Sequence, residues 1–268
     1  MAAKAAHPAS HALEKPMHRL LLICSALFLL ASTTAHAGPG VNLRWTDCFG
    51  DGGLLNRNFA CDTNSGNHFL IASFELGQPI LQALEQEMVL DLAAADASLP
   101  SWWAFRNVAT CRQQSLFLTF NVPLTSVACQ DWGRGKTGGG IGYYRIGHLG
   151  PNTARLALAS AVPNSDPPNL VAGQEYYSFS VVINSARTVG TDSCNGCTVP
   201  VCLVFSSLKV KTPIAANDRT LTGATNGTDS FYATWQGGGV PMTPRGTGCP
   251  AATPTRKETW SGVKSLYR

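Results

Sequence analysis

The amino-acid sequence predicts an all-β fold, either an antiparallel β-sandwich or a jelly roll with long disulfide-braced loops. Three observations predict it: short apolar segments with strand-like alternation, frequent turn residues between them, and an even set of cysteines behind an export signal. The 268-residue chain contains 26 Gly and 16 Pro, which punctuate the apolar segments. Segments with the strand pattern are Val41–Trp45, His68–Leu76, Met88–Ala94, Ser115–Asn121, Ala154–Val162, Glu175–Asn184, Val199–Val210 and Ser230–Trp235.

The segment before Ala94 also has a second interpretation. Apolar residues recur there at a spacing of four, which would place them on one face of a helix. These residues are Ile80, Leu84, Met88 and Leu92. A short helix is also expected at Thr259–Tyr267, and long loops at Gly133–Gly142 and Thr243–Thr255.

Residues 1–37 have the pattern of a signal peptide, with Met17 as the expected initiator. Arg19 precedes the apolar run Leu20–Ala31, and Ala35-His36-Ala37 has the small-x-small form that signal peptidase recognises. We expect cleavage before Gly38, so that residues 38–268 form a single β-sandwich-like domain. The apolar run is shorter than the roughly 20 residues of a membrane-spanning helix, although an uncleaved anchor is an alternative.

Charge argues against a nucleic-acid ligand. Only 13% of the residues are charged, whereas about 25% is usual. Loss of residues 1–37 removes three basic residues and one acidic residue, so the formal net charge falls from +4 to +2. Since no Lys/Arg cluster remains, we expect no binding to DNA or RNA.

Eight cysteines follow the predicted cleavage site, and an even number in an exported chain indicates disulfides. Local pairing predicts Cys48–Cys61 and Cys111–Cys129, each contributing about 3 kcal/mol in the chain-entropy model. The remaining cysteines would pair among themselves; they are Cys194, Cys197, Cys202 and Cys249. A structural zinc site of these four is the first alternative, and a redox pair at the C-x-x-C motif is the second.

Two oxygen-rich loops suggest calcium. Asp47, Asp51, Asp62 and Asn64 would lie close together if Cys48 were bonded to Cys61, and carboxylate and carbonyl oxygens are the ligands that calcium prefers. The alternative is conformational, because Asp and Asn are also common in turns for reasons of backbone geometry.

Large rings give the main indication of function. Exposed Trp and Tyr side chains on a β-sandwich can stack on sugar rings, so a polysaccharide or another envelope component is a candidate partner. The alternative is that these rings are core and edge anchors. Candidate ligand-binding residues are Trp102, Trp103, Trp132, Tyr143, Tyr144, Tyr176, Tyr177 and Trp235.

Catalytic motifs are weak. Gly133–Gly138 matches G-x-G-x-x-G but lacks a following helix, so it indicates a mobile turn. There is no G-x-S-x-G elbow, and His68 and His148 are the only histidines after residue 37. Paired acids for a glycoside hydrolase or lyase are conceivable. Those acids are Glu85, Glu87, Asp91 and Asp96, of which the first two would share a strand face.

Several segments resemble one group of proteins. The chain resembles uncharacterised exported proteins of environmental bacteria in five segments. These segments are Gly40–Cys48, Leu99–Phe105, Thr188–Cys197, Pro200–Phe205 and the ending Lys264–Arg268. The resemblance covers most of residues 38–268 and implies export but no activity, so it assigns no functional residue.

Together, these observations predict an exported, non-catalytic protein with a structural or binding role, located in the periplasm, on the cell surface or in the medium. Glycan binding is the most concrete version. The alternatives are a carboxylate-based glycoside hydrolase or lyase and an assembly subunit of a surface structure, which would present an exposed edge strand or a flat apolar patch.

Overall fold

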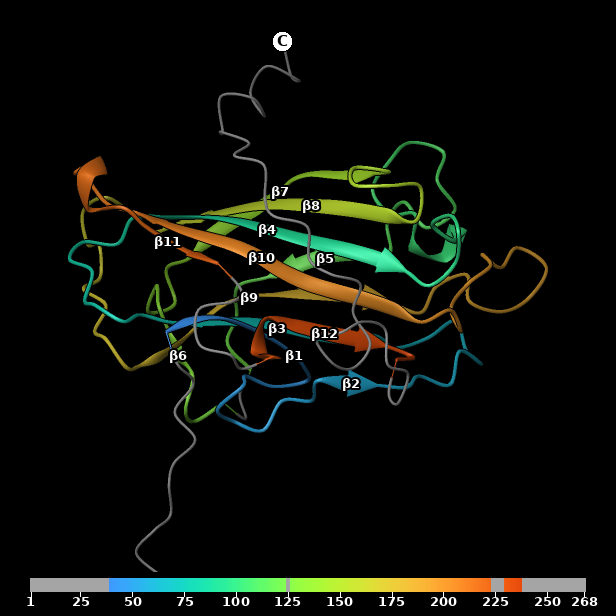
Figure 1. Cartoon of the computed structure of the whole chain (residues 1–268), viewed down its shortest axis with the longest axis horizontal. Coiled ribbons are helices and arrows are strands. Elements are labelled where there is room, and N and C mark those ends of the chain that lie inside the picture. The colour runs from blue at the N-terminus through green and yellow to red at the C-terminus, as the bar shows by residue number, and fades with distance from the viewer. Residues whose placement is uncertain (1–38, 124–125, 223–228, 238–268) are drawn as a thin grey trace, which may run out of the picture. The chain divides into compact units, whose positions relative to one another are not determined.

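The fold is a sandwich of two β-sheets that face each other across one core (Figure 1). The computed structural model describes residues 39–123, 126–222 and 229–237. The predicted signal peptide, the helix expected at 259–267, the loop expected at 243–255 and Cys249 lie outside these residues. Among the described residues, no helix is long and apolar enough to cross a membrane.

The first sheet has five strands in the order β1-β3-β9-β5, and a short strand, β6, runs parallel to β9. Their bounds are β1 Gly40–Trp45, β3 Asn67–Glu75, β5 Leu116–Thr119, β6 Gln130–Asp131 and β9 Glu175–Asn184. The sequence predicts four of these strands because each has the alternating or continuous apolar pattern of a buried strand.

The second sheet has seven strands in the order β2-β12-β10-β4-β8-β7, with β11 pairing to β10. Their bounds are β2 Asn56–Arg57, β4 Glu85–Ala94, β7 Gly138–Ile146, β8 Thr153–Ala161, β10 Val201–Lys211, β11 Arg219–Thr222 and β12 Tyr232–Trp235. Three short 3-10 helices complete the described elements: Ser101–Trp103, Ala215–Asn217 and Asp229–Phe231. The all-β sandwich predicted from the sequence is therefore confirmed.

Two local predictions are wrong. The helical interpretation around Met88 fails because β4 lies between β8 and β10 and pairs with both along its length. The long loop predicted at 133–142 ends early, because β7 begins at Gly138 and pairs with β8. Glycine has low strand propensity, so the three consecutive glycines that open β7 resemble a loop in the sequence.

Disulfides join segments that are distant in the sequence. The bonds are Cys48–Cys129, Cys61–Cys197 and Cys111–Cys194, with sequence separations of 81, 136 and 83 residues. Cys202 is disulfide-bonded as well. The predicted Cys48–Cys61 and Cys111–Cys129 pairs are therefore wrong, and so is pairing of Cys194 and Cys197 within their own group. Cys194, Cys197 and Cys202 are disulfide-bonded and therefore offer no free thiol to the predicted zinc site or redox pair.

Candidate functional site: the exposed edge of the seven-stranded sheet

The predicted sugar-stacking rings lie mostly inside the protein. Seven of the eight have exposed fractions of 0–5%, whereas Tyr143 is half-buried. The buried rings are Trp102, Trp103, Trp132, Tyr144, Tyr176, Tyr177 and Trp235. These seven cannot stack on a ligand from outside, which corrects that prediction.

Five of the seven buried rings form hydrogen bonds with the protein, whereas the indole N–H groups of Trp103 and Trp132 have no hydrogen-bond partner among the described residues. Tyr144 Oη donates to the Trp103 carbonyl oxygen at 2.6 Å, and Trp235 Nε1 donates to the Cys197 carbonyl oxygen at 2.6 Å. Tyr176 and Tyr177 are neighbours on β9 and so point to opposite faces of the sheet. Both are buried nonetheless, because Tyr177 packs on the outer face against the Cys48–Cys129 disulfide.

The predicted calcium ligands do not gather into one site. Asp51 accepts backbone N–H donors from residues 127–129, and Asp47 accepts the Cys48 N–H and the Ser126 hydroxyl. Asn64 lies on another loop, where it accepts the N–H groups of residues 188 and 189. Since Cys48 is not bonded to Cys61, no disulfide joins the two predicted loops.

One group of metal-capable side chains does occur among the described residues, formed by Cys48, Cys129 and Glu175. The two cysteines are bonded to each other, and Glu175 accepts the N–H groups of Phe49 and Gly50 at 3.1 and 2.8 Å. The Glu175 carboxylate and the disulfide therefore hold the loop at Phe49 and Gly50 in place.

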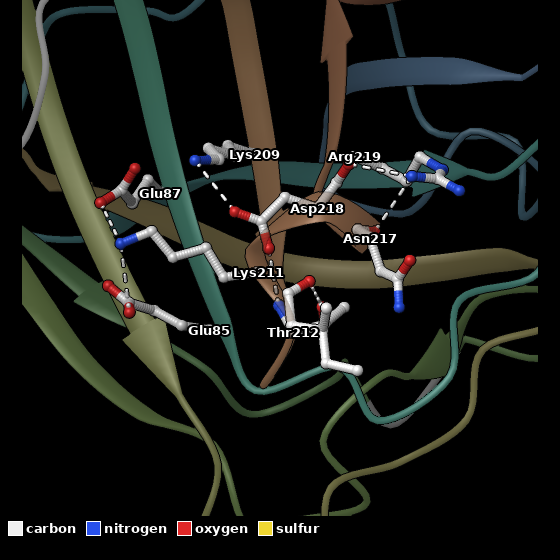
Figure 2. A network of polar contacts seen from close by, with 9 residues as sticks. Glu85, Glu87, Lys209, Lys211, Thr212, Asn217, Asp218 and Arg219 are labelled. Atoms are coloured by element: carbon white, nitrogen blue, oxygen red, sulfur yellow. Dashed lines mark hydrogen bonds and ion pairs between the residues drawn. The ribbon is translucent and has the colours of Figure 1, made fainter.

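Three of the four predicted acids are bound by cations. Glu85 and Glu87 lie on one face of β4, as predicted, but both form ion pairs with Lys211 on β10 (Figure 2). Asp91 receives two hydrogen bonds from Arg155, at 2.7 and 2.8 Å. Asp96 is exposed in the turn that follows β4. These contacts hold the strands of the sheet together and do not leave a pair of acids facing a substrate site.

A serine and a histidine lie within hydrogen-bond distance, which the sequence did not indicate. His68 Nε2 is 2.9 Å from Ser185 Oγ. Burial, followed by the positive charges of Arg57 and Arg112, lowers the pKa of His68 from 6.5 to about 4. In a catalytic triad a carboxylate stabilises the imidazolium, so the charges here have the sign opposite to that of such a triad.

A small cavity lies between the sheets, with a volume of about 20 Å³. Its lining includes Leu90, Trp103 and Tyr144, which are core residues. This volume has room for about one water molecule and is much too small for a sugar.

The turn at Gly133–Gly138 is held in place by an acid. Asp131 accepts the backbone N–H groups of Gly133 and Gly135. Asp166 adds ion pairs to Arg134 and Lys136 across the same turn. A carboxylate therefore occupies the donors that a phosphate would need, which excludes a phosphate cradle in this arrangement. The turn leads directly into β7.

Strand β7 is the longest margin strand among the described strands. Its only strand neighbour there is β8, and it lies at the margin of the seven-stranded sheet (Figure 1). The opposite margin, β2, has two residues, and β5 at the edge of the other sheet has four. On the edge strand β1 of the five-stranded sheet, Arg44 donates hydrogen bonds to the carbonyl oxygens of Ser230 and Tyr232.

The first half of β7 consists of three exposed glycines. Gly138, Gly139 and Gly140 are exposed, and a Cβ atom added at Gly138 or Gly140 would have no atom within 4 Å. Gly139 faces the other way, toward Phe120. Ile141 packs partly against the core, which fixes the strand's orientation.

The second half of β7 carries large side chains after a register shift between residues 141 and 143. Tyr144 is buried, Arg145 is exposed, and Ile146 is 36% exposed. Arg145 is the only charged residue of this strand. Proteins usually protect an exposed edge with charged side chains, proline or β-bulges, and β7 has an exposed charge at Arg145 and a register irregularity between residues 141 and 143.

The fold defines an all-β, disulfide-linked protein with β7 at the margin of its seven-stranded sheet. Comparison with known proteins adds no closer assignment: no family model, no curated protein and no solved structure matches the chain.

Proposed function

We propose that this chain works outside the cytoplasm as a non-catalytic structural or binding protein whose binding surface is the exposed glycine segment that opens β7, Gly138–Gly140. The observation that carries the proposal is the exposed glycine segment Gly138–Gly140 of the margin strand β7, where a Cβ atom added at Gly138 or Gly140 would meet no atom within 4 Å. An exposed edge of this kind adds an extended segment of another chain through main-chain hydrogen bonds. The predicted role as a surface assembly subunit fits this arrangement.

Export is supported by the disulfides. Disulfides persist in oxidising compartments and are rare in the cytosol of most cells. The predicted leader and the resemblance to exported bacterial proteins favour the same compartment, namely the periplasm, the cell surface or the medium.

Two rival functions have less support from the geometry. Glycan binding through rings has lost seven of its eight candidate platforms to the interior. A carboxylate-based hydrolase has three of its four candidate acids engaged, since Glu85 and Glu87 bind Lys211 and Asp91 binds Arg155.

Site-specific photo-cross-linking in the producing cell tests the proposal. The photoreactive residue p-benzoylphenylalanine replaces Gly140, where a side chain has open space, and in a second variant it replaces Phe69. Phe69 is the matched control because it is 43% exposed, aromatic already, and located on β3 in the other sheet.

We expect a discrete cross-linked product from position 140 and none from position 69. Cross-linking from position 69 alone would move the binding surface to the other sheet. Equal products from both positions, or no product from either, would overturn the proposal, as would release of sugars from a polysaccharide by the purified protein.

A further inference from the structure

We infer that residues 238–249 form a strap across the outer face of β10 and β12, fastened by a disulfide between Cys249 and Cys202. Three observations support the strap: the bonding state of Cys202, the burial of its neighbours, and the short stretch of chain that joins the two cysteines. The strap concerns β10 and β12 and not β7, so it stands apart from the proposed function.

Cys202 is the one described cysteine whose disulfide partner lies outside the described residues. The six other described cysteines pair with one another in three bonds, and Cys202 is disulfide-bonded as well. The chain has two further cysteines, Cys24 and Cys249. Cys24 lies in the predicted leader, which export would remove, so Cys249 is the partner that remains in an exported chain.

Side chains around Cys202 are buried although they point away from the core between the sheets. Neighbouring residues of a strand point to opposite faces, and Val201 and Leu203 belong to that core. Cys202 and Val204 therefore face outward, yet they are only 0% and 6% exposed. Tyr232 on β12 belongs to the same outer cluster and is 3% exposed.

The cover is local to this end of β10. At the other end of the strand, the outward-facing side chains of Lys209 and Lys211 are 40% and 24% exposed and form the ion pairs drawn in Figure 2. Within the described part of the chain, the hydrophobic side chains packed against the outer cluster are Leu55 and Phe231, which are themselves only partly buried. Because apolar side chains are buried at one end of this face only, a covering segment is needed there, and a segment bonded to Cys202 would supply it.

The chain that follows β12 begins at the right place and has a suitable composition. Thr234 on β12 lies opposite Cys202, and Cys249 follows Thr234 by 15 residues. The entropy cost of closing a loop grows only slowly with its length, so a return over this stretch is readily made. Residues 238–249 carry Val, Met and Pro side chains and a single charge, on Arg245, which suits an apolar surface.

The bond forms by oxidation of the two thiols. Cys202 and Cys249 lose their S–H protons and pass two electrons to the disulfide of a thiol oxidase, which becomes a dithiol as the new S–S bond forms. Reduction reverses this step and releases the strap, so that the outer cluster becomes accessible to solvent.

Peptide mapping of the purified, exported protein without reduction tests the bond. Trypsin excises residues 246–256, which contain Cys249, and a second protease cuts between Cys197 and Cys202. We expect the two resulting peptides to be linked and to separate on reduction. A link from Cys202 to Cys24, or alkylation of Cys249 without reduction, would overturn the inference.

Hydroxyl-radical footprinting of Tyr232 tests the cover. In the double variant Cys202→Ala/Cys249→Ala no bond holds the strap, and no unpaired thiol is left behind. We expect oxidation of Tyr232 to rise several-fold in this variant. Phe117 is the internal control, because it is 41% exposed on β5 of the other sheet and should react equally in both proteins.

A second variant keeps the bond and disturbs only the strap. Val240→Lys combined with Met242→Lys charges its apolar side chains, and oxidation of Tyr232 should again rise. Circular dichroism and thermal unfolding confirm that each variant is folded. Unchanged oxidation of Tyr232 in the folded variants would refute the strap even if the Cys202–Cys249 bond is found.

Discussion

Acidification should destabilise the protein through His68. The ring packs against Phe59 and Trp235, with centroid distances of 4.3 and 5.0 Å, and its Nε2 atom faces Ser185 Oγ. Burial and two nearby guanidinium groups lower its pKa from 6.5 to about 4. The unfolded chain therefore binds a proton on this histidine at a higher pH than the folded protein does.

The sign and size follow from proton linkage. Between pH 6.5 and pH 4 the unfolded state holds the extra proton, so the free energy of unfolding falls as the pH is lowered through this window. A pKa difference of this size corresponds to about 3.4 kcal/mol for a fully buried group. Because the ring is partly exposed, solvent screening reduces the expected loss to about 1–2 kcal/mol.

Urea unfolding from pH 7.5 to pH 3.5 tests this expectation, with His68→Gln as the variant and His148→Gln as the matched control. Glutamine keeps a polar group near Ser185 but does not titrate, so the difference between the unmodified protein and His68→Gln isolates the histidine from the carboxylates. The difference should change by about 1–2 kcal/mol between pH 7 and pH 4. A flat difference, or one of opposite slope, would refute the reasoning.

Two further substitutions probe the seven-stranded sheet. Asp91→Ala removes the carboxylate that binds buried Arg155, so we expect the free energy of unfolding in urea to fall by about 3–5 kcal/mol. Ser206→Ala is the control, because it removes one hydrogen bond to Asp91 and should lower the free energy of unfolding by about 1 kcal/mol. Similar losses from both would contradict the ion-pair argument. Gly139→Val should lower the melting temperature strongly, because its Cβ would overlap the Ala159 carbonyl oxygen and lie 2.8 Å from Phe120. Gly138→Val, which meets nothing within 4 Å, is its control and should leave the melting temperature nearly unchanged.

Strands with continuous or alternating apolar residues were predictable from the sequence. Glu175–Asn184 appears in the structure with the predicted bounds, as β9, because aromatic and β-branched residues fill both faces of a buried strand. Strand β7 was missed for the opposite reason: its glycines carry no hydrophobic pattern, and its pairing with β8 is a tertiary contact.

The candidate site shows the same limit. Sequence alone indicates that Trp102 and Trp103 are adjacent, but not that both lie in a 3-10 helix packed against Trp235. The edge strand that now carries the proposal has no chemical motif, since its significance comes from its position at the margin of a sheet. Separation along the chain likewise misled the disulfide prediction, because proximity in space depends on the sheet order.

The order of the disulfides has a consequence for how the cell must make this protein. Along the chain the cysteines of the three bonds occur as Cys48, Cys61, Cys111, Cys129, Cys194 and Cys197, and none is bonded to its next neighbour. An oxidase that joins thiols in the order in which they occur along the chain would couple Cys48 to Cys61 first. Such a bond must then be exchanged, and reshuffling takes seconds to hours depending on the oxidant and isomerase present. Maturation should therefore depend on a thiol–disulfide isomerase in the receiving compartment, and a host that only oxidises would accumulate mispaired chains.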